Sequence, residues 1–261
     1  MLRVILFALA AIAIAACSSS SYNASVFPYQ INNDLLKEKP VKKVVIASAN
    51  FSGEPTRFYL QKAALRIDSK VKTYLQQNGY EVAPSYLFDN AWNQAIRTYG
   101  EMYDPTTGRV DQTTWQAVLV TTAKSLKEST DIDAIVFTDV IEHDSAHSIG
   151  LDHQAQWYGV SRKPGFSSAG QSSVPADFDW NQSVRVASLV VTIYSVDLVG
   201  LFSSRGGLDT LQVIDGKMST PSYVRRKKIL DNDSNVEEGI RLALHPFIPA
   251  KNYPVAGNHG G

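Results

Sequence analysis

The sequence predicts an α/β domain built on one mixed sheet, with a parallel first half and an antiparallel hairpin extension. Up to residue 143, short continuous apolar runs alternate with helical stripes, as parallel strands joined by helical crossovers require. Beyond that point, two long runs rich in β-branched residues follow one another with a tight turn between them. We place this domain at residues 42–250.

The first half is predicted as strand, helix, strand. Residues 42–51 contain the unbroken apolar run Val44 to Ala47, which is typical of a strand buried on both faces. A helix follows, and Gly79 is placed to end it in a left-handed conformation. Its apolar stripe recurs at steps of three and four residues: Leu60, Ala64, Ile67, Val71 and Leu75. Residues 80–84 then give a short strand that Pro84 stops.

Two more helices and two strand regions complete the sheet. Asp89 and Asp111 are suited to cap the two helices, and residues 133–143 return to a strand with a continuous apolar core. Residues 183–196 and 201–215 are then expected to form antiparallel strands around a turn at 197–200.

A packed helix is expected to close the domain. Ser234 and Glu237 have the spacing of a capping box, and apolar residues recur behind them at helical steps.

The amino terminus has the composition of a secretory signal peptide. Arg3 precedes an apolar run that is too short to span a bilayer, and residues 14–17, Ile-Ala-Ala-Cys, resemble the bacterial lipobox. We therefore expect residues 1–16 to be removed and Cys17 to be acylated. Ser18 after the cysteine implies sorting to the outer membrane, with the domain facing the periplasm. Cys17 is the single cysteine, so no disulfide and no thiolate ligand is expected.

The segments that flank the domain are predicted to be flexible. Residues 17–41 are read as the lipidated cysteine and a tether, with a root-mean-square span of roughly 27 Å, and residues 251–261 as a frayed tail. The 25 basic and 25 acidic residues give a formal net charge of zero. No global field would therefore recruit nucleic acid.

Several segments occur in an order that resembles a group of bacterial envelope lipoproteins. This group includes the penicillin-binding-protein activator LpoB, the amino-terminal domain of TolB and the curli secretion lipoprotein CsgG. The resemblance covers roughly residues 42–250 and implies a single three-layer Rossmann-like domain. Besides the lipobox, it is carried by "KKVVIASANF", "LQQNGYEVAP", "DAIVFTDV", "VVTIYSVDLVGLFSSRGG" and "VEEGIRLALHPF".

Three groups of residues outside the predicted core are candidate sites. Trp157 and Tyr158 lie beside a Gly/Ser/Pro-rich loop, and we predict that this aromatic pair binds a partner. His143, His147 and His153 invite a metal hypothesis, but on a strand residues four apart stand about 13 Å from each other; we expect no metal and no cofactor. The basic run 225–228 is expected to be an exposed face balanced by the acidic residues that follow it, with a lipid headgroup contact as the alternative.

The sequence contains no nucleophile elbow, phosphate-binding loop or metalloprotease helix. We therefore expect a non-enzymatic accessory or assembly factor, anchored in the outer membrane, that binds another envelope protein. The alternative is a subunit of an oligomeric export channel or transport complex, which would make the chain a homo-oligomer. A hydrolase of cell-wall or lipid material is the third hypothesis, because a Ser/His/Asp triad forms in space rather than in sequence order.

Overall fold

The computed structural model describes most of the predicted domain. The predictions for residues 1–16, for Cys17 and for most of the tail 251–261 lie outside the described residues. The described residues are 28–47, 58–104, 106, 109–147, 153–168, 170, 173–217, 219–251 and 253.

Six strands form one mixed sheet in the order β1-β8-β7-β4-β2-β3. β2 pairs in parallel with both β3 and β4, whereas β4, β7, β8 and β1 pair antiparallel in succession. The α/β class and the mixed sheet are therefore confirmed. The strand bounds are β1 Tyr29–Ile31, β2 Lys43–Ala47, β3 Glu81–Ala83, β4 Ala134–Ser145, β7 Val184–Ser195 and β8 Gly200–Thr210.

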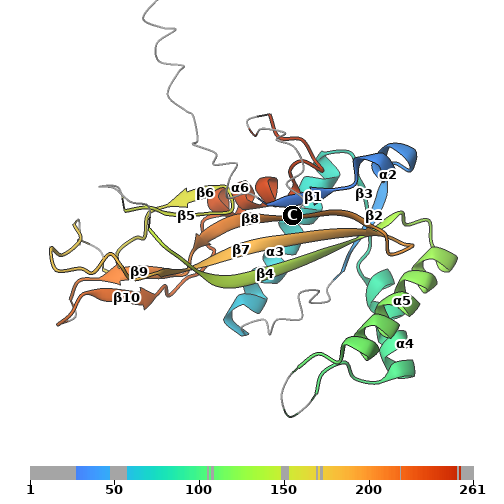
Figure 1. Ribbon diagram of the computed structural model, residues 1–261, viewed down its shortest axis with the longest axis horizontal. Coiled ribbons are helices and arrows are strands. Elements are labelled where there is room, and N and C mark those ends of the chain that lie inside the picture. The colour runs from blue at the N-terminus through green and yellow to red at the C-terminus, as the bar shows by residue number, and fades with distance from the viewer. Residues whose placement is uncertain are drawn as a thin grey trace, which may run out of the picture.

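Two short hairpins accompany the sheet. β5 (Ala155–Trp157) pairs with β6 (Val160–Arg162), and β9 (Gln212–Asp215) pairs with β10 (Ser222–Arg225). Figure 1 shows the long strands β4, β7 and β8 side by side, with β9 and β10 beyond one end of them and the helices α4 and α5 at the other end.

Helices pack on both faces of β2, because its side chains alternate between two apolar clusters. Val44 and Ile46 lie in the cluster that contains the apolar stripes of α3 and α6. Val45 and Ala47 lie in the cluster that contains those of α4 and α5. The continuous apolar run thus reflects burial on both faces. The helix bounds are α2 Asn33–Glu38, α3 Phe58–Gln77, α4 Tyr86–Tyr99, α5 Gln112–Ser129 and α6 Asp233–Leu244.

Of the three predicted helix caps, one is confirmed and two are wrong. The Asp111 carboxylate accepts hydrogen bonds from the amides of Thr113 and Thr114, so this cap is confirmed. Asp89, however, lies inside the first turn of α4. A carboxylate there interacts favourably with the positive end of the helix dipole but does not cap the helix.

Ser234 likewise lies inside α6 instead of capping it. Asn232 is the cap, and its side chain accepts from the amide of Asn235 at 3.2 Å. Glu237 is turned toward α3, where it pairs with Lys70 at 3.0 Å. The capping-box spacing was therefore a coincidence of composition.

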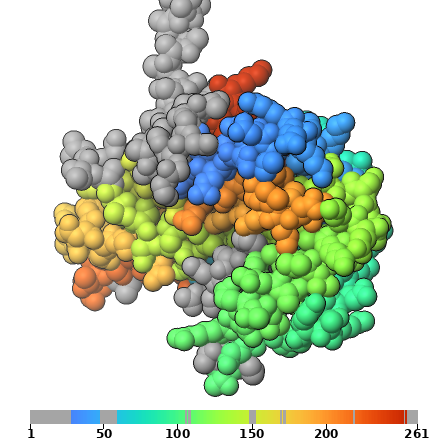
Figure 2. Space-filling model, turned by 45° about the vertical axis from the view of Figure 1, so that its right-hand side comes forward, coloured from blue at the N-terminus to red at the C-terminus, as the bar shows by residue number. Residues whose placement is uncertain are grey.

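The folded domain begins earlier than the predicted boundary at residue 42. Tyr29 to Ile31 pair with β8 as the edge strand β1, and the side chain of Asn32 caps α2. Leu35 and Leu36 of α2 pack against the main core cluster. In Figure 2 the blue surface of this segment lies directly on the orange strands. The tether prediction is thus wrong from residue 29 onward, because β8 offers the segment a sheet edge.

Gly206 and Gly239 allow α6 to touch β8 backbone to backbone, and Gly207 leaves room for the β5–β6 hairpin on the other side of β8. A Cβ atom at Gly206 would lie 2.1 Å from the carbonyl oxygen of Gly239, and one at Gly239 would lie 2.6 Å from the carbonyl oxygen of Gly207. On Gly207, a Cβ atom would instead meet Val160 and Trp157 of the β5–β6 hairpin, at 2.2 and 2.8 Å. Side chains of any size are therefore excluded at all three positions.

Replacing Gly239 with alanine should destabilise the protein, although alanine is the better helix former by about 1 kcal/mol. The clash with β8 forces α6 outward, and overpacking of this kind costs roughly 1–3 kcal/mol. The measurement is the free energy of unfolding by chemical denaturation. Gly200→Ala is the control, because its nearest neighbour would be a Tyr194 ring carbon at 3.8 Å. A Gly239→Ala variant as stable as the control would contradict the close contact.

Candidate interaction surface

The β5–β6 hairpin separates the two predicted partner-binding residues. Tyr158 and Gly159 form its turn, with φ values of 35° and 82°, as tight hairpin turns require. Trp157 precedes the turn and is only 4% exposed. Its indole nitrogen donates to the carbonyl oxygen of Ala187 at 3.3 Å. The prediction that Trp157 binds a partner is wrong, because its side chain is part of the core.

Tyr158 remains half-exposed and is held over the sheet. Its hydroxyl accepts a hydrogen bond from Arg205 of β8 at 2.9 Å, and the guanidinium carbon lies 5.5 Å from the ring centroid. The ring of His143 also packs against the ring of Tyr158, with 5.1 Å between the two centroids. Tyr158 and Arg205 thus form a fixed pair, whose residue types are enriched at the energetic centres of interfaces.

Polar and aromatic side chains continue from this pair across β8, β7 and β1. Ser203 lies two residues before Arg205 on β8, on the same face of the strand. Its hydroxyl lies 3.5 Å from that of Thr192 on β7, and it pairs in register with Gln30 of β1. We call this surface the open sheet face. It consists of Gln30, Tyr158, Thr192, Tyr194, Ser203 and Arg205, all exposed or half-exposed.

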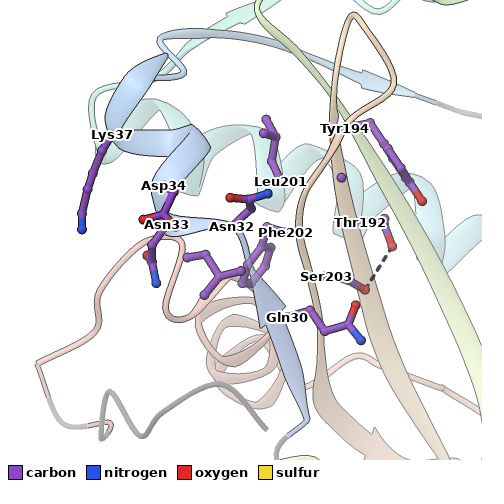
Figure 3. Close-up of a pocket in the computed structure, with 12 residues that line it drawn as sticks. Gln30, Asn32, Asn33, Asp34, Lys37, Thr192, Tyr194, Leu201, Phe202 and Ser203 are labelled. Carbon is purple, nitrogen blue, oxygen red and sulfur yellow. Dashed lines mark hydrogen bonds between the residues drawn. The ribbon is translucent and has the colours of Figure 1, made fainter. Parts of the chain in front are cut away.

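A shallow depression of about 650 Å³ occupies the β1 side of the open sheet face. Figure 3 shows Gln30, Thr192 and Ser203 gathered on neighbouring strands, with Asn33, Asp34 and Lys37 of α2 on the other side. Its lining is mainly polar. Such a surface suits a protein partner better than an apolar small molecule, whose sites are mostly hydrophobic.

The three histidines of the metal hypothesis have separate neighbours. His143 lies on β4, as the strand prediction expected, and faces Tyr158. His147 is bound by the Tyr223 hydroxyl, which lies 2.7 Å from Nε2, and His153 stacks on Trp180 at 3.8 Å. Burial lowers the pKa of His147 and raises that of Tyr223, which favours the neutral form of both side chains. Within the described ranges, no three His, Cys, Asp or Glu side chains are grouped around one point.

One hydrogen bond joins a serine to a histidine, two of the residue types that form a hydrolase triad. The Oγ atom of Ser188 lies 2.8 Å from Nε2 of His143, whose Nδ1 faces the carbonyl oxygen of Asp144 at 3.3 Å. Because a carbonyl only accepts, Nδ1 carries the proton and Nε2 accepts from the serine. Burial lowers the pKa of His143. Ser188 has no exposed surface, however, so no substrate reaches it and the pair serves the packing between β4 and β7.

A second polar site lies where β2 ends and β4 continues. Ala47, the last residue of β2, pairs with Phe137 of β4. The hydroxyl of Thr138, the next residue of β4, donates to the carboxylate of Asp68 on α3 at 2.7 Å. Asp139 is only 7% exposed. Burial is the main reason why the pKa of Tyr103 is raised, and the negative charge of Asp139 is the second reason. The carboxyl ends of parallel strands at a change of strand order are where open α/β sheets bind ligands. The connecting residues 48–57 lie outside the described residues.

Comparison with known proteins adds no relative. No family model, no curated protein and no solved structure matches this chain. In the part of the chain that the structure describes, no helix has the length and apolar character needed to cross a membrane.

Trp157 and Tyr158 should differ sharply when each is changed to alanine. Trp157→Ala removes a buried side chain and is expected to cost about 3–5 kcal/mol of unfolding free energy. Tyr158→Ala removes a half-exposed one and should cost about 1 kcal/mol. Denaturant titration of both variants measures the two values. Equal losses would contradict the separation of the pair into a core residue and a surface residue.

The half-buried carboxyl of Asp68 should give the protein a specific pH dependence. Burial raises its pKa to about 6, against about 3.9 in an unfolded chain. Between these values the native state holds a proton that the unfolded state has lost, so stability falls as the pH rises from about 4 to 6. Above pH 6 the contribution stays constant.

Asp68→Asn removes the titrating group and keeps an acceptor for Thr138. The variant should melt at a higher temperature than the wild type at pH 8, and the difference should shrink toward zero at pH 4. Melting curves across this range test it, with exposed Asp177→Asn as the control. A difference that does not change with pH would contradict the raised pKa of the Asp68 carboxyl.

Proposed function

We propose that this chain is an outer-membrane lipoprotein whose periplasmic domain is a non-enzymatic accessory factor, and that it binds another envelope protein through the open sheet face. The observation that carries the proposal is the Tyr158–Arg205 pair, fixed by a 2.9 Å hydrogen bond yet accessible from solvent. The predicted acylation of Cys17 supplies the anchor. The one Ser–His pair described above is buried, which weighs against the hydrolase.

The position of β1 supports attachment close to a bilayer. β1 is the first described element and borders the open sheet face. The chain from Cys17 to Pro28 has about half as many residues as the predicted tether 17–41, and it spans at most about 40 Å at full extension. A partner on this face would therefore meet the domain near the membrane that holds it.

The arrangement of the elements supports the resemblance as a proposal. Parallel β3, β2 and β4, with α3 on one face and α4 and α5 on the other, suit a Rossmann-like three-layer domain, extended by the antiparallel β7 and β8. We propose that the chain is an envelope lipoprotein similar in design to the LpoB, TolB amino-terminal and CsgG group.

Photocrosslinking in intact cells tests this function. A photoreactive amino acid in place of Ser203 should give one dominant protein conjugate, whereas the same amino acid in place of exposed Lys72 on α3 should not. Adding Arg205→Ala should lower the yield several-fold, because it removes the anchor of Tyr158. Labelling with a palmitate analogue should mark the wild type and not Cys17→Ser. Equal conjugates from both positions, or an unlabelled wild type, would overturn the proposal.

A further inference from the structure

A basic groove lies between β8, β10 and the beginning of α6. Figure 1 shows β9 and β10 extending beyond one end of the long strands. Its volume is about 760 Å³. Five cationic side chains and two carboxylates line it: Lys163, Arg225, Arg226, Lys227 and Lys228, with Asp209 and Asp215.

Among the described residues, only one of the five cations is paired with a carboxylate. Arg226 donates to the buried carboxylate of Asp209 at 2.7 Å and to Asp231 at 3.3 Å. The second oxygen of Asp209 accepts from the amide of Thr210 at 2.8 Å. Arg226 and Asp209 therefore hold the floor of the groove together, and their charges cancel.

The remaining carboxylates nearby are turned to other partners. Asp215 accepts from the backbone amide of Lys217 at 3.0 Å, and Asp233 pairs with Lys70 of α3 at 3.2 Å. The basic run 225–228 was predicted to be balanced by the acidic residues that follow it. That expectation is correct for Arg226 alone.

Four cations are left facing the groove without a carboxylate partner among the described residues: Lys163, Arg225, Lys227 and Lys228. The guanidinium of Arg225 is also fixed in orientation, because it stacks on the ring of Tyr59 at 4.0 Å. A planar guanidinium and several ammonium groups around one hollow match the charge and oxygen geometry of phosphate. The first turn of α6 adds a weaker attraction of the same sign.

We propose that this groove binds a phosphate-bearing anion, presented either by a lipid headgroup or by a soluble phosphate ester. The short chain between Cys17 and Pro28 favours the headgroup, because it keeps the groove within reach of a bilayer surface. This preference rests on the proposed acylation of Cys17. The proposal that the groove binds phosphate does not depend on that acylation.

Native mass spectrometry of the full chain, released from neutral detergent micelles, tests the groove. The probes are inorganic phosphate, glycerol 3-phosphate, and micelles that contain phosphatidylglycerol or, as a neutral comparison, phosphatidylcholine. Lys227→Gln with Lys228→Gln should reduce the bound fraction of the anionic probe at least tenfold without changing the melting temperature. The matched control is Lys62→Gln with Lys72→Gln, two exposed lysines of α3, which should bind as the wild type does.

Each outcome decides the matter. Adducts with phosphatidylglycerol but not with the soluble probes support the headgroup, and adducts with both support a site for phosphate esters in general. No adduct with any anionic probe, or equal adducts in both double variants, overturns the proposal. The mass of the chain reports acylation in the same spectrum, so an unacylated chain that still binds phosphate would refute the anchor and keep the groove.

Discussion

The contact between α6 and β8 is the constraint on which the other features depend. Gly206 and Gly239 bring the two backbones together where a single Cβ atom would lie 2.1 Å from a carbonyl oxygen. Gly207, the next residue, leaves the same room for Trp157 on the opposite side. β8 is therefore clamped between a helix and a hairpin at successive residues, because successive positions of a strand face opposite sides of its sheet.

The clamp explains why the surface residues occupy fixed positions. Because Gly207 has no side chain, Trp157 packs against it in the core. The turn after Trp157 then places Tyr158 over the sheet, where its hydroxyl accepts a hydrogen bond from Arg205. The alternation of β8 puts Ser203 on the same face as Arg205. One long strand thus sets the spacing of Ser203 and Arg205, and the tight β5–β6 turn adds Tyr158 beside them. Sites built on strands are held more rigidly than sites on loops.

The sequence predicted most of the elements but little of the surface. Periodicity located β2, α3, β4 and β7, because burial on one or two faces leaves a direct pattern in the chain. β1 escaped detection because three residues carry too short a pattern and their partner lies more than 170 positions away. Trp157 was assigned to the surface because aromatic residues beside a polar loop suit both a core and an interface. The pair Gly206 and Gly207 was the available signal, since adjacent strand glycines mark close approach.

The proposed anchor, the open sheet face and the basic groove are related through β8. β1 pairs with β8 at Ser203 and Ser204, the open sheet face uses Ser203 and Arg205, and the groove uses Asp209 and Thr210 at the end of the strand. Five residues of a strand span about 17 Å, so these features lie along one rigid axis. A domain held at β1 by a short chain and at the groove by headgroups would have two fixed points on that axis. Its rotation relative to the bilayer would then be restricted, and the open sheet face would be presented to a partner in a defined orientation.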